Sequence, residues 1–487
     1  MARSGVIVAY NTGRGLLGRF ATNGRRMKRS LTVVACVMGF HAAFAADLVA
    51  VYQRALQNDP QLREAEATRL AALESKPQAL AALLPQLIGN ALATRERDTG
   101  PSNLIENVTV AGGPTIIESF PFDGHTITHD HKYGVDLKQN IFRWENWVAL
   151  QRADARVAQA EADYQAAQQD LISRVAQRYF DVLASQDDLD AQEGALDSVS
   201  HQLEQAEQRY AVGLIAITDV QEARASHDSS AAAVIAAKRQ IASAQEFLRE
   251  ITGDLFDTLA RPMEPFELDN PDPISEDRWV EMALQQNLSL VSSRLAADIA
   301  RDNVSSVRGG HFPSLDLIAS GYKVHTDGDS INSDGTPYGS STLDQNQRSI
   351  GIQLTFPLYS GGMVSSQVRQ AVYQHRAAKE RVERVARQTE HDARDAYLGV
   401  ISEITHVKAL RRAVESNTTA LKATQTGYEA GTRTAVDVLE SRRRWIQAKT
   451  DYSRSRYDYM MNVLKLQQAA GILSEQSLNR LNALLKE

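Results

Sequence analysis

Two carboxylates near the end of the chain have a spacing that suits ion binding. Asp437 and Glu440 are three residues apart, and positions i and i+3 share one face of a helix. Crowded carboxylates repel one another and attract cations. The segment from Thr434 to Asp437 also matches a capping box, in which the aspartate binds an amide at a helix start. The two roles are not exclusive, so both stay open.

Three histidines form a second candidate site. His125, His129 and His131 follow Asp123 at a spacing that could hold a metal ion. Their segment is rich in polar residues, so we interpret them as solvent-exposed histidines of a loop. The sequence predicts no metal and no cofactor.

Motifs of common enzyme classes are absent from the sequence. It contains no G-x-x-x-x-G-K-[ST], no H-E-x-x-H and no G-x-S-x-G, which bind phosphate, bind zinc and carry a nucleophilic serine, respectively. We therefore predict that the protein is not an enzyme. A soluble enzyme with helical arms is a disfavoured interpretation.

The first 45 residues have the features of a secretory signal peptide. Basic residues after Met27 precede the mostly apolar residues 31–40, and an A-x-A site ends at Ala45. We predict translation from Met27 and cleavage after Ala45. A twin-arginine signal at Arg25-Arg26 and a lipid anchor at Cys36 are weaker interpretations.

Removal of this segment makes the chain more acidic. The full sequence of 487 residues has a formal net charge of −7, and the part after Ala45 has 46 basic and 60 acidic residues, a net charge of −14. Phosphate binding needs basic patches, so nucleic acid is an unsuitable partner. Cys36 is the single cysteine, and no disulfide is expected.

The positions of proline predict two regions of long helix. All 13 prolines lie outside residues 122–261 and 358–487, and a proline inside a helix costs about 3 kcal/mol. Both windows are rich in good helix formers such as Ala, Gln, Glu and Arg. No stretch approaches the roughly 18–20 apolar residues of a membrane-spanning helix, which excludes an α-helical membrane protein.

The chain contains an internal tandem duplication. The segment from Tyr210 to Gly213 recurs at Tyr428 to Gly431, and Gly253 recurs as Gly471, at one common offset of 218 residues. A register kept over such a distance indicates a repeat. Each half is predicted to contain a helical segment, two strands around a polar loop, a long helix, a turn with glycine and another helix.

The predicted strands have one apolar face. Ile350, Ile352 and Leu354 alternate with small or polar residues, and polar loops are expected at roughly 96–131 and 325–347. A half-buried soluble hairpin and a membrane β-barrel both fit this alternation. Four strands cannot close a barrel, and lipid does not tolerate open strand edges. A barrel would therefore need several chains, and three chains would supply twelve strands.

These features together resemble the TolC family of outer-membrane channels. The resemblance runs from about Ala46 to the C-terminus, and it is specific in five segments: residues 58–62, 83–87, 213–220, 359–363 and 427–439. It implies a mixed α+β membrane protein. Three chains with four strands each would form a twelve-stranded β-barrel in the outer membrane, and a long α-helical barrel would continue it across the periplasm.

The resemblance also implies how the chain is divided. The expected parts are a signal peptide at 1–45, a first repeat at 46–253 with a β-hairpin at 86–142, a linker at 254–275, a second repeat at 276–471 with a β-hairpin at 313–358, and a C-terminal segment at 472–487. The linker and the C-terminal segment would form a belt around the middle of the helical tunnel.

By the same resemblance, the periplasmic tip of the helices is a gate. The predicted clamp joins Tyr428 and Arg433 to Thr218, Asp219 and Gln202, and would hold the inner helix pair against its neighbours.

Two further pairs of residues complete this gate. Asp437 and Glu440 would point into the pore, where three chains would present a ring of six carboxylates. The family usually has aspartate where Glu440 stands, but the charge is the same. Gly213 and Gly431 are the predicted turn glycines.

The implied function is that of a passive exit duct for efflux or type I secretion. The implied partners are two further copies of the chain, a periplasmic adaptor, and an inner-membrane transporter that is either an ABC or a proton-driven protein. The cargo would be an exported protein or small molecules, and the sequence does not distinguish these. A periplasmic adaptor protein is the alternative, because such proteins are also exported and rich in helical hairpins.

Overall fold

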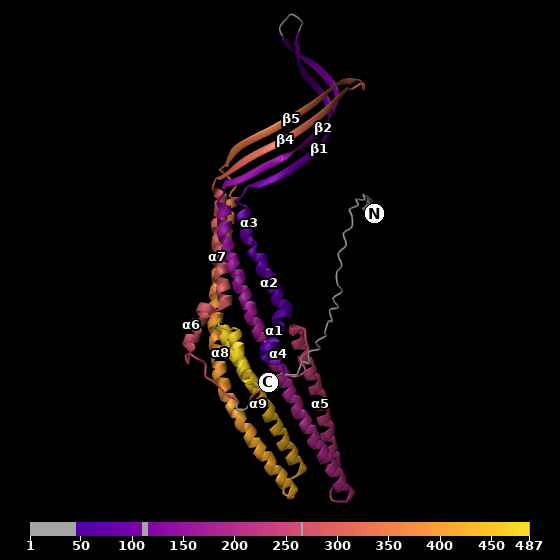
Figure 1. Ribbon diagram of the computed structural model, residues 1–487, viewed down its shortest axis with the longest axis vertical. Coiled ribbons are helices and arrows are strands. Elements are labelled where there is room, and N and C mark those ends of the chain that lie inside the picture. The colour runs from indigo at the N-terminus through magenta and orange to yellow at the C-terminus, as the bar shows by residue number, and fades with distance from the viewer. Residues whose placement is uncertain (1–44, 110–114, 264–265, 487) are drawn as a thin grey trace, which may run out of the picture. The chain divides into compact units, whose positions relative to one another are not determined.

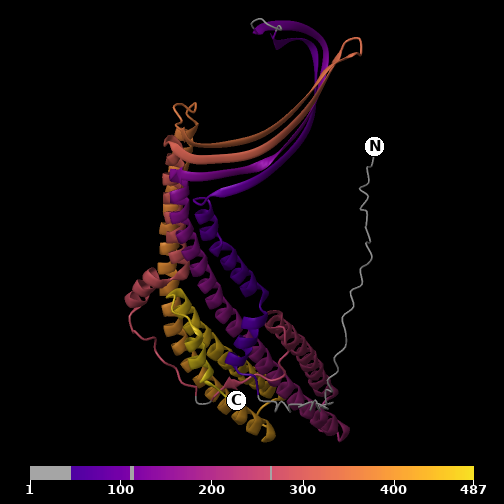
Figure 2. The ribbon, with the colours of Figure 1, turned by 45° about the horizontal axis from the view of Figure 1, so that its top comes forward.

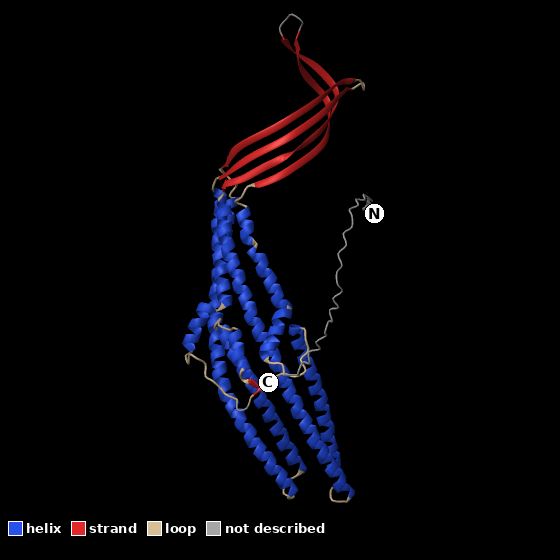
Figure 3. Ribbon diagram, viewed as in Figure 1, coloured by secondary structure: helices blue, strands red, loops and turns tan. Residues whose placement is uncertain are grey.

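The computed structural model describes residues 45–109, 115–263 and 266–486. The predicted signal peptide lies outside the described residues except for Ala45. Residues 45–487 form one compact unit, in which long helices lie side by side and a sheet continues from one end of them (Figures 1, 2 and 3). Secondary structure therefore separates along this unit into a helical part and a strand part.

The helices of the first half are followed by an equivalent set in the second half. Those of the first half are α1 (Leu48–Asn58), α2 (Pro60–Leu73), α3 (Ser75–Ala81), α4 (Trp144–Ala211) and α5 (Ile217–Thr252). Those of the second half are α6 (Glu276–Gln286), α7 (Leu288–Arg308), the 3-10 turn η1 (Gly309–His311), α8 (Met363–Glu429), α9 (Ala435–Ala469) and α10 (Glu475–Asn482). Within the described ranges, no helix has both the length and the apolar character needed to cross a membrane.

The two longest helices occupy the proline-free windows. Helix α4 has 68 residues and α8 has 67, so each extends about 100 Å at 1.5 Å per residue. Each continues through a short turn into α5 or α9, which packs back along it. Both turns lie at the end of the helices opposite to the sheet (Figure 1).

The sheet consists of two hairpins side by side. Its strands are β1 (Gln86–Thr109), β2 (Thr115–Phe142), β4 (Ser314–Asn332) and β5 (Pro337–Thr355), in the order β1-β2-β4-β5 and antiparallel throughout. A second, small sheet pairs β3 (Arg261–Pro262) with β6 (Leu485–Lys486). Strands β1 and β5 are the open edges of the large sheet.

The long polar loops predicted at 96–131 and 325–347 are wrong. The ladder of β1 and β2 continues to Thr109 opposite Thr115, so most of the first predicted loop is strand. Polar side chains bond across the ladders there: Thr326 donates to Asp130 at 2.6 Å, and His325 lies 2.8 Å from Asp344. Backbone pairing needs no apolar residues, and cross-strand polar pairs stabilise a sheet.

The duplication is visible in backbone geometry. Gly213 and Gly431 have φ angles of 77° and 73°, and Gly253 and Gly471 have 77° and 76°. These are left-handed conformations that end helices and favour glycine. The two halves thus share their helix ends, which confirms the predicted tandem repeat.

The main hydrophobic core lies where α1, α4, α9 and α10 meet. Its fully buried side chains include Leu48, Leu171, Tyr179, Met460, Leu464 and Leu478. The chain between α5 and α6 is fixed to the same region, since Arg261 donates to Asp190 at 2.9 Å and Tyr459 donates to the carbonyl of Asp269 at 2.9 Å. A role of these segments as a belt around a tunnel stays a prediction.

The Asn58-Asp59-Pro60 sequence ends α1 and starts α2. Asp59 is the N-cap of α2 and accepts from the amide of Leu62 at 2.9 Å, while Pro60 occupies the first turn, where no amide is needed. The carboxylate also accepts two hydrogen bonds from Arg174 of α4, at 2.9 and 3.3 Å. Asp59 is only 3% exposed, so this contact joins α2 to α4 inside the protein.

Candidate functional site

One face of the large sheet is an exposed apolar band. Cross-strand pairing aligns Leu87, Leu137, Ala319 and Ile350 in a single row over all four strands. Large side chains in and beside this row are unusually accessible, with Leu87 68% and Ile350 78% exposed. Contiguous exposed apolar surface of this kind marks a contact with lipid or with another protein.

The other face of the sheet is polar. Asp136 accepts hydrogen bonds from Asn90 and from the hydroxyl of Tyr322. The ammonium group of Lys132 lies 4.1 Å from the centre of the Tyr322 ring. One apolar and one polar face is the arrangement of a sheet between lipid and water.

The two helix turns at the opposite end have the same hydrogen bonds. In the α4–α5 turn, the amides of Gly213 and Leu214 donate to the carbonyls of Tyr210 and Arg209, both at 2.9 Å. In the α8–α9 turn, Gly431 and Thr432 donate in the same way to Tyr428 and Gly427, at 3.0 and 2.8 Å. Each is a Schellman motif, which satisfies the last carbonyls of a helix. The predicted turn glycines therefore occupy equivalent left-handed positions.

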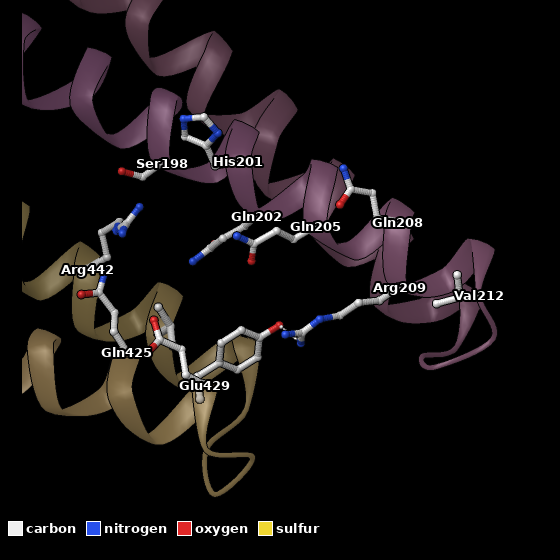
Figure 4. Close-up of a pocket in the computed structure, with 12 residues that line it drawn as sticks. Ser198, His201, Gln202, Gln205, Gln208, Arg209, Val212, Gln425, Glu429 and Arg442 are labelled. Carbon is white, nitrogen blue, oxygen red and sulfur yellow. Dashed lines mark hydrogen bonds between the residues drawn. The ribbon is translucent and has the colours of Figure 1, made fainter.

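A direct contact joins the two hairpins near these turns. Arg209 of α4 donates from Nη1 to the hydroxyl of Tyr428 on α8 at 3.2 Å, and its guanidinium carbon lies 5.4 Å from the centre of the Tyr428 ring. Figure 4 shows Arg209 reaching from α4 across the gap between the helices. The contact combines a hydrogen bond with a cation–π interaction, and it ties the end of α4 to the end of α8.

Two cavities flank this contact. One of about 730 Å³ lies between α4 and the α8–α9 hairpin, with Gln202 and Arg209 on one side and Gln425 and Arg442 on the other (Figure 4). The second, of about 420 Å³, is lined by Gln202, Asp219 and Tyr428, among others. The structure therefore brings three members of the predicted clamp around one cavity.

The two candidate carboxylates differ in what they bind. Asp437 accepts from the amide of Thr434 at 2.9 Å, and the Thr434 hydroxyl accepts from the amide of Asp437 at 3.2 Å. These reciprocal bonds confirm the predicted capping box. The bond from the Thr434 amide holds the pKa of Asp437 below its usual range. Glu440 instead accepts from Nε of Arg444, one turn further along α9, at 3.0 Å.

Two members of the clamp lie elsewhere. Thr218 is exposed in the first turn of α5. Arg433 is exposed, and its aliphatic part lies over Gly427, where an added Cβ would come within 2.8 Å of its Cγ. The complete clamp of Tyr428 and Arg433 with Thr218, Asp219 and Gln202 stays a prediction.

Sequence reasoning missed Arg209 and Gly427. The position of Arg209, directly before the repeated tyrosine and glycine, was the available signal. Gly427 gave no signal, because its role depends on the side chain that folds over it.

The three histidines lie on β2, not in a loop. His131 is exposed and faces His325 across the β2–β4 ladder, with ring centres 6.4 Å apart. His325 lies 2.8 Å from a carboxylate oxygen of Asp327 and from one of Asp344. Among the described residues, no group of three or more potential ligands is arranged to hold a metal ion.

A family model supplies the deciding comparison. The model named "Outer membrane efflux protein" matches residues 51–254 and 279–472, which together are most of the chain. The chain belongs to the outer membrane efflux protein family. The two matched segments correspond to the two halves of the duplication.

Individual proteins agree with this assignment. This outer membrane efflux protein is 36% identical over 445 residues to the outer membrane protein TolC of Vibrio cholerae, covering 91% of this chain and 95% of the relative. It is 27% identical to the proteases secretion protein PrtF of Dickeya chrysanthemi, covering 94% and 95%. The crystal structure of the Campylobacter jejuni CmeC outer membrane channel has the same fold, with a TM-score of 0.71, 20% identity, and coverage of 90% of this chain and 89% of that one.

Membership in the family confirms several predictions. The protein is an outer-membrane channel for efflux or secretion that extends into the periplasm, and it is not an enzyme. The predicted fold class is confirmed, with long helices and four strands of one sheet in each chain. A periplasmic adaptor, the alternative that the sequence left open, does not fit this membership.

Proposed function

We propose that this outer membrane efflux protein is the homotrimeric exit duct of a tripartite efflux pump or a type I secretion system, and that its periplasmic tip is a gate. The observation that carries the gate is the contact between Arg209 and Tyr428, which joins the two hairpins near their turns. Exported protein or small molecules would pass through the duct passively. An inner-membrane transporter, ABC or proton-driven, would supply the energy through a periplasmic adaptor.

The open sheet supports a trimer. Strands β1 and β5 each leave one side unpaired in the chain, and unpaired backbone groups are costly in lipid. The polar face of the sheet would line a water-filled interior, and the apolar band around Leu87 and Ile350 would face lipid. Three chains would pair β5 of one with β1 of the next and close a barrel of twelve strands.

We expect the protein extracted in mild detergent to be a trimer that stays assembled during gel electrophoresis unless the sample is heated. Light scattering coupled to size-exclusion chromatography should give three chains per particle after correction for detergent. Unheated gels should show one slow band that heating converts to the monomer. A folded monomer that keeps its β-content, measured by circular dichroism, would contradict the closed barrel.

The gate would carry the carboxylates Asp437 and Glu440 around its opening. Three chains would present six carboxylates, which raise the local concentration of cations. Asp437 would fill this role in addition to its cap, because an aspartate that caps α9 through one oxygen still carries its charge.

The test of the ring removes charge and leaves the cap. We expect Asp437→Asn combined with Glu440→Gln to lower the preference for cations in planar bilayers and to weaken block by divalent cations, because the side chains keep their shape and lose their charge. The matched control is Glu383→Gln, an exposed glutamate on α8 with an arginine four residues later. If the ring variant keeps wild-type selectivity, Asp437 is a helix cap and not part of a pore ring.

A further inference from the structure

Three consecutive arginines follow Glu440 at the start of α9. Glu440 accepts from Nε of Arg444 at 3.0 Å, and its other oxygen lies 3.9 Å from Nη1 of Arg443. Glutamate four residues before arginine is the favourable order for an ion pair on a helix. The carboxylate therefore has a compensating charge within its own helix.

The three arginines point in different directions around α9. At 100° per residue, Arg444 lies about 20° from Asp437 and about 40° from Glu440, so all three share one stripe. Arg442 lies more than a third of a turn away from that stripe, and it faces α4 across the cavity in Figure 4. Arg443 lies on the side of Glu440 away from Asp437. Of the three, Arg444 is the one on the face of the two carboxylates.

Arg444 also lies deeper along the helix than the carboxylates. Helix α9 starts at the tip and runs toward the sheet (Figure 1). At 1.5 Å per residue, Arg444 is about 6 Å beyond Glu440 and about 10 Å beyond Asp437. A solute entering at the tip would therefore meet the carboxylates first and a positive charge one to two turns later.

We propose that Arg444 sets the charge selectivity of the entrance by compensating Glu440. This inference rests on the proposed gate at the tip. On the shared stripe each chain carries two negative charges and one positive charge, so three chains carry −3 and not −6. The entrance then opposes anions less than a bare carboxylate ring would.

The test compares variants that change only this balance. Arg444→Gln should change the net charge of the entrance from −3 to −6. Glu440→Gln should change it from −3 to 0. Three unit charges acting from about 10 Å through salt water should increase the cation-to-anion permeability ratio about fourfold and tighten block by a divalent cation by a similar factor for Arg444→Gln. Glu440→Gln should change both in the opposite direction.

The double variant distinguishes charge from structure. Glu440→Gln with Arg444→Gln restores −3, so its selectivity should return to that of the wild type. The matched control is Arg387→Gln on α8, whose pair with Glu383 has the same spacing and the same 3.0 Å distance, and which should leave selectivity unchanged. Gels of unheated protein report whether each variant still assembles. Exposed ion pairs contribute little to stability, so assembly should be intact.

The outcomes separate this inference from the proposed gate. If Asp437→Asn with Glu440→Gln shifts selectivity but Arg444→Gln matches the wild type or Arg387→Gln, the role of Arg444 is overturned and the carboxylate ring stands. If neither variant shifts selectivity, the ring and the role of Arg444 both fail. If the double variant stays as far from the wild type as a single one, Arg444 does not act by compensating Glu440.

Discussion

Tyr428→Phe combined with Arg433→Ser is expected to open the tip and to raise single-channel conductance in planar bilayers. The first change removes the hydroxyl that accepts from Arg209 at 3.2 Å. The second removes the side chain that covers Gly427. A partly exposed contact of this kind contributes about 0.5–1 kcal/mol, so three symmetric copies would favour the closed tip by about 1.5–3 kcal/mol. Losing them should increase the open population about 10- to 150-fold.

Two single variants test which contact matters. Arg209→Gln should reproduce much of the effect, because it removes the same hydrogen bond from the other side. Tyr210→Phe is the matched control, since Tyr210 is the equivalent tyrosine of the first repeat and its side chain is exposed. A clamp variant that conducts like the wild type would show that these residues do not hold the gate.

Asp59→Ala is expected to destabilise the helical part severely. The substitution removes the cap of α2 and two hydrogen bonds from Arg174, which keeps only its ion pair with Asp170, in a site where Asp59 is 3% exposed. Loss of a helix cap costs about 1 kcal/mol and loss of a hydrogen bond to a charged group about 1.5–3 kcal/mol, so we expect a loss of about 2–4 kcal/mol. The measurement is the midpoint of urea or thermal unfolding, followed by helical circular dichroism of the detergent-solubilised protein.

A second ion pair between the same two helices provides the control. Arg69 of α2 lies 3.1 Å from Glu161 of α4, but both side chains are more exposed than Asp59. Glu161→Ala should therefore cost less than about 1 kcal/mol. Equal losses for the two variants would contradict the assignment of a special role to the buried Asp59.

The contribution of Asp59 should depend on pH in a defined direction. Burial by itself raises the pKa of Asp59, but hydrogen bonds from Arg174 and from the amide of Leu62 outweigh it, so the pKa is lowered on folding. A lowered pKa gives stability that is fully present above the unfolded value of about 3.9 and is lost as the pH falls through the folded pKa. The gap in unfolding midpoint between wild type and Asp59→Asn should be constant from pH 7 to 5 and narrow below about pH 4.

Local signals in the sequence determined most of the helical part. Windows without proline located α4 and α8, and the repeated tyrosine and glycine located the turns after them. The capping box at Thr434 could also be predicted from the sequence. Helix ends and helix interiors depend on hydrogen bonds between residues three to five positions apart, so a short window of sequence contains the necessary information.

The sequence predicts the strands only in part. Alternation around Ile350 identified the apolar face of the sheet, because a strand that meets lipid on one side has a period of two. Beyond that band the strands are polar, and the sequence pattern there predicts loops. Their pairing depends on partners such as Asp130 and Thr326, which are far apart in the sequence, and no local pattern reports such a partner.

The contacts between helices that are distant in the sequence were decided by tertiary structure alone. Arg209 and Tyr428 are 219 residues apart, and Asp59 and Arg174 are 115 apart. Each pair forms because α4 packs beside a second helix at one rotation and one register, which many side chains along α4 set together. The sequence by itself determined the helices, the turns, the repeat and the residues that carry charge. Only the packed structure decided which charge meets which partner, because that depends on distances through space between segments that the chain order leaves free.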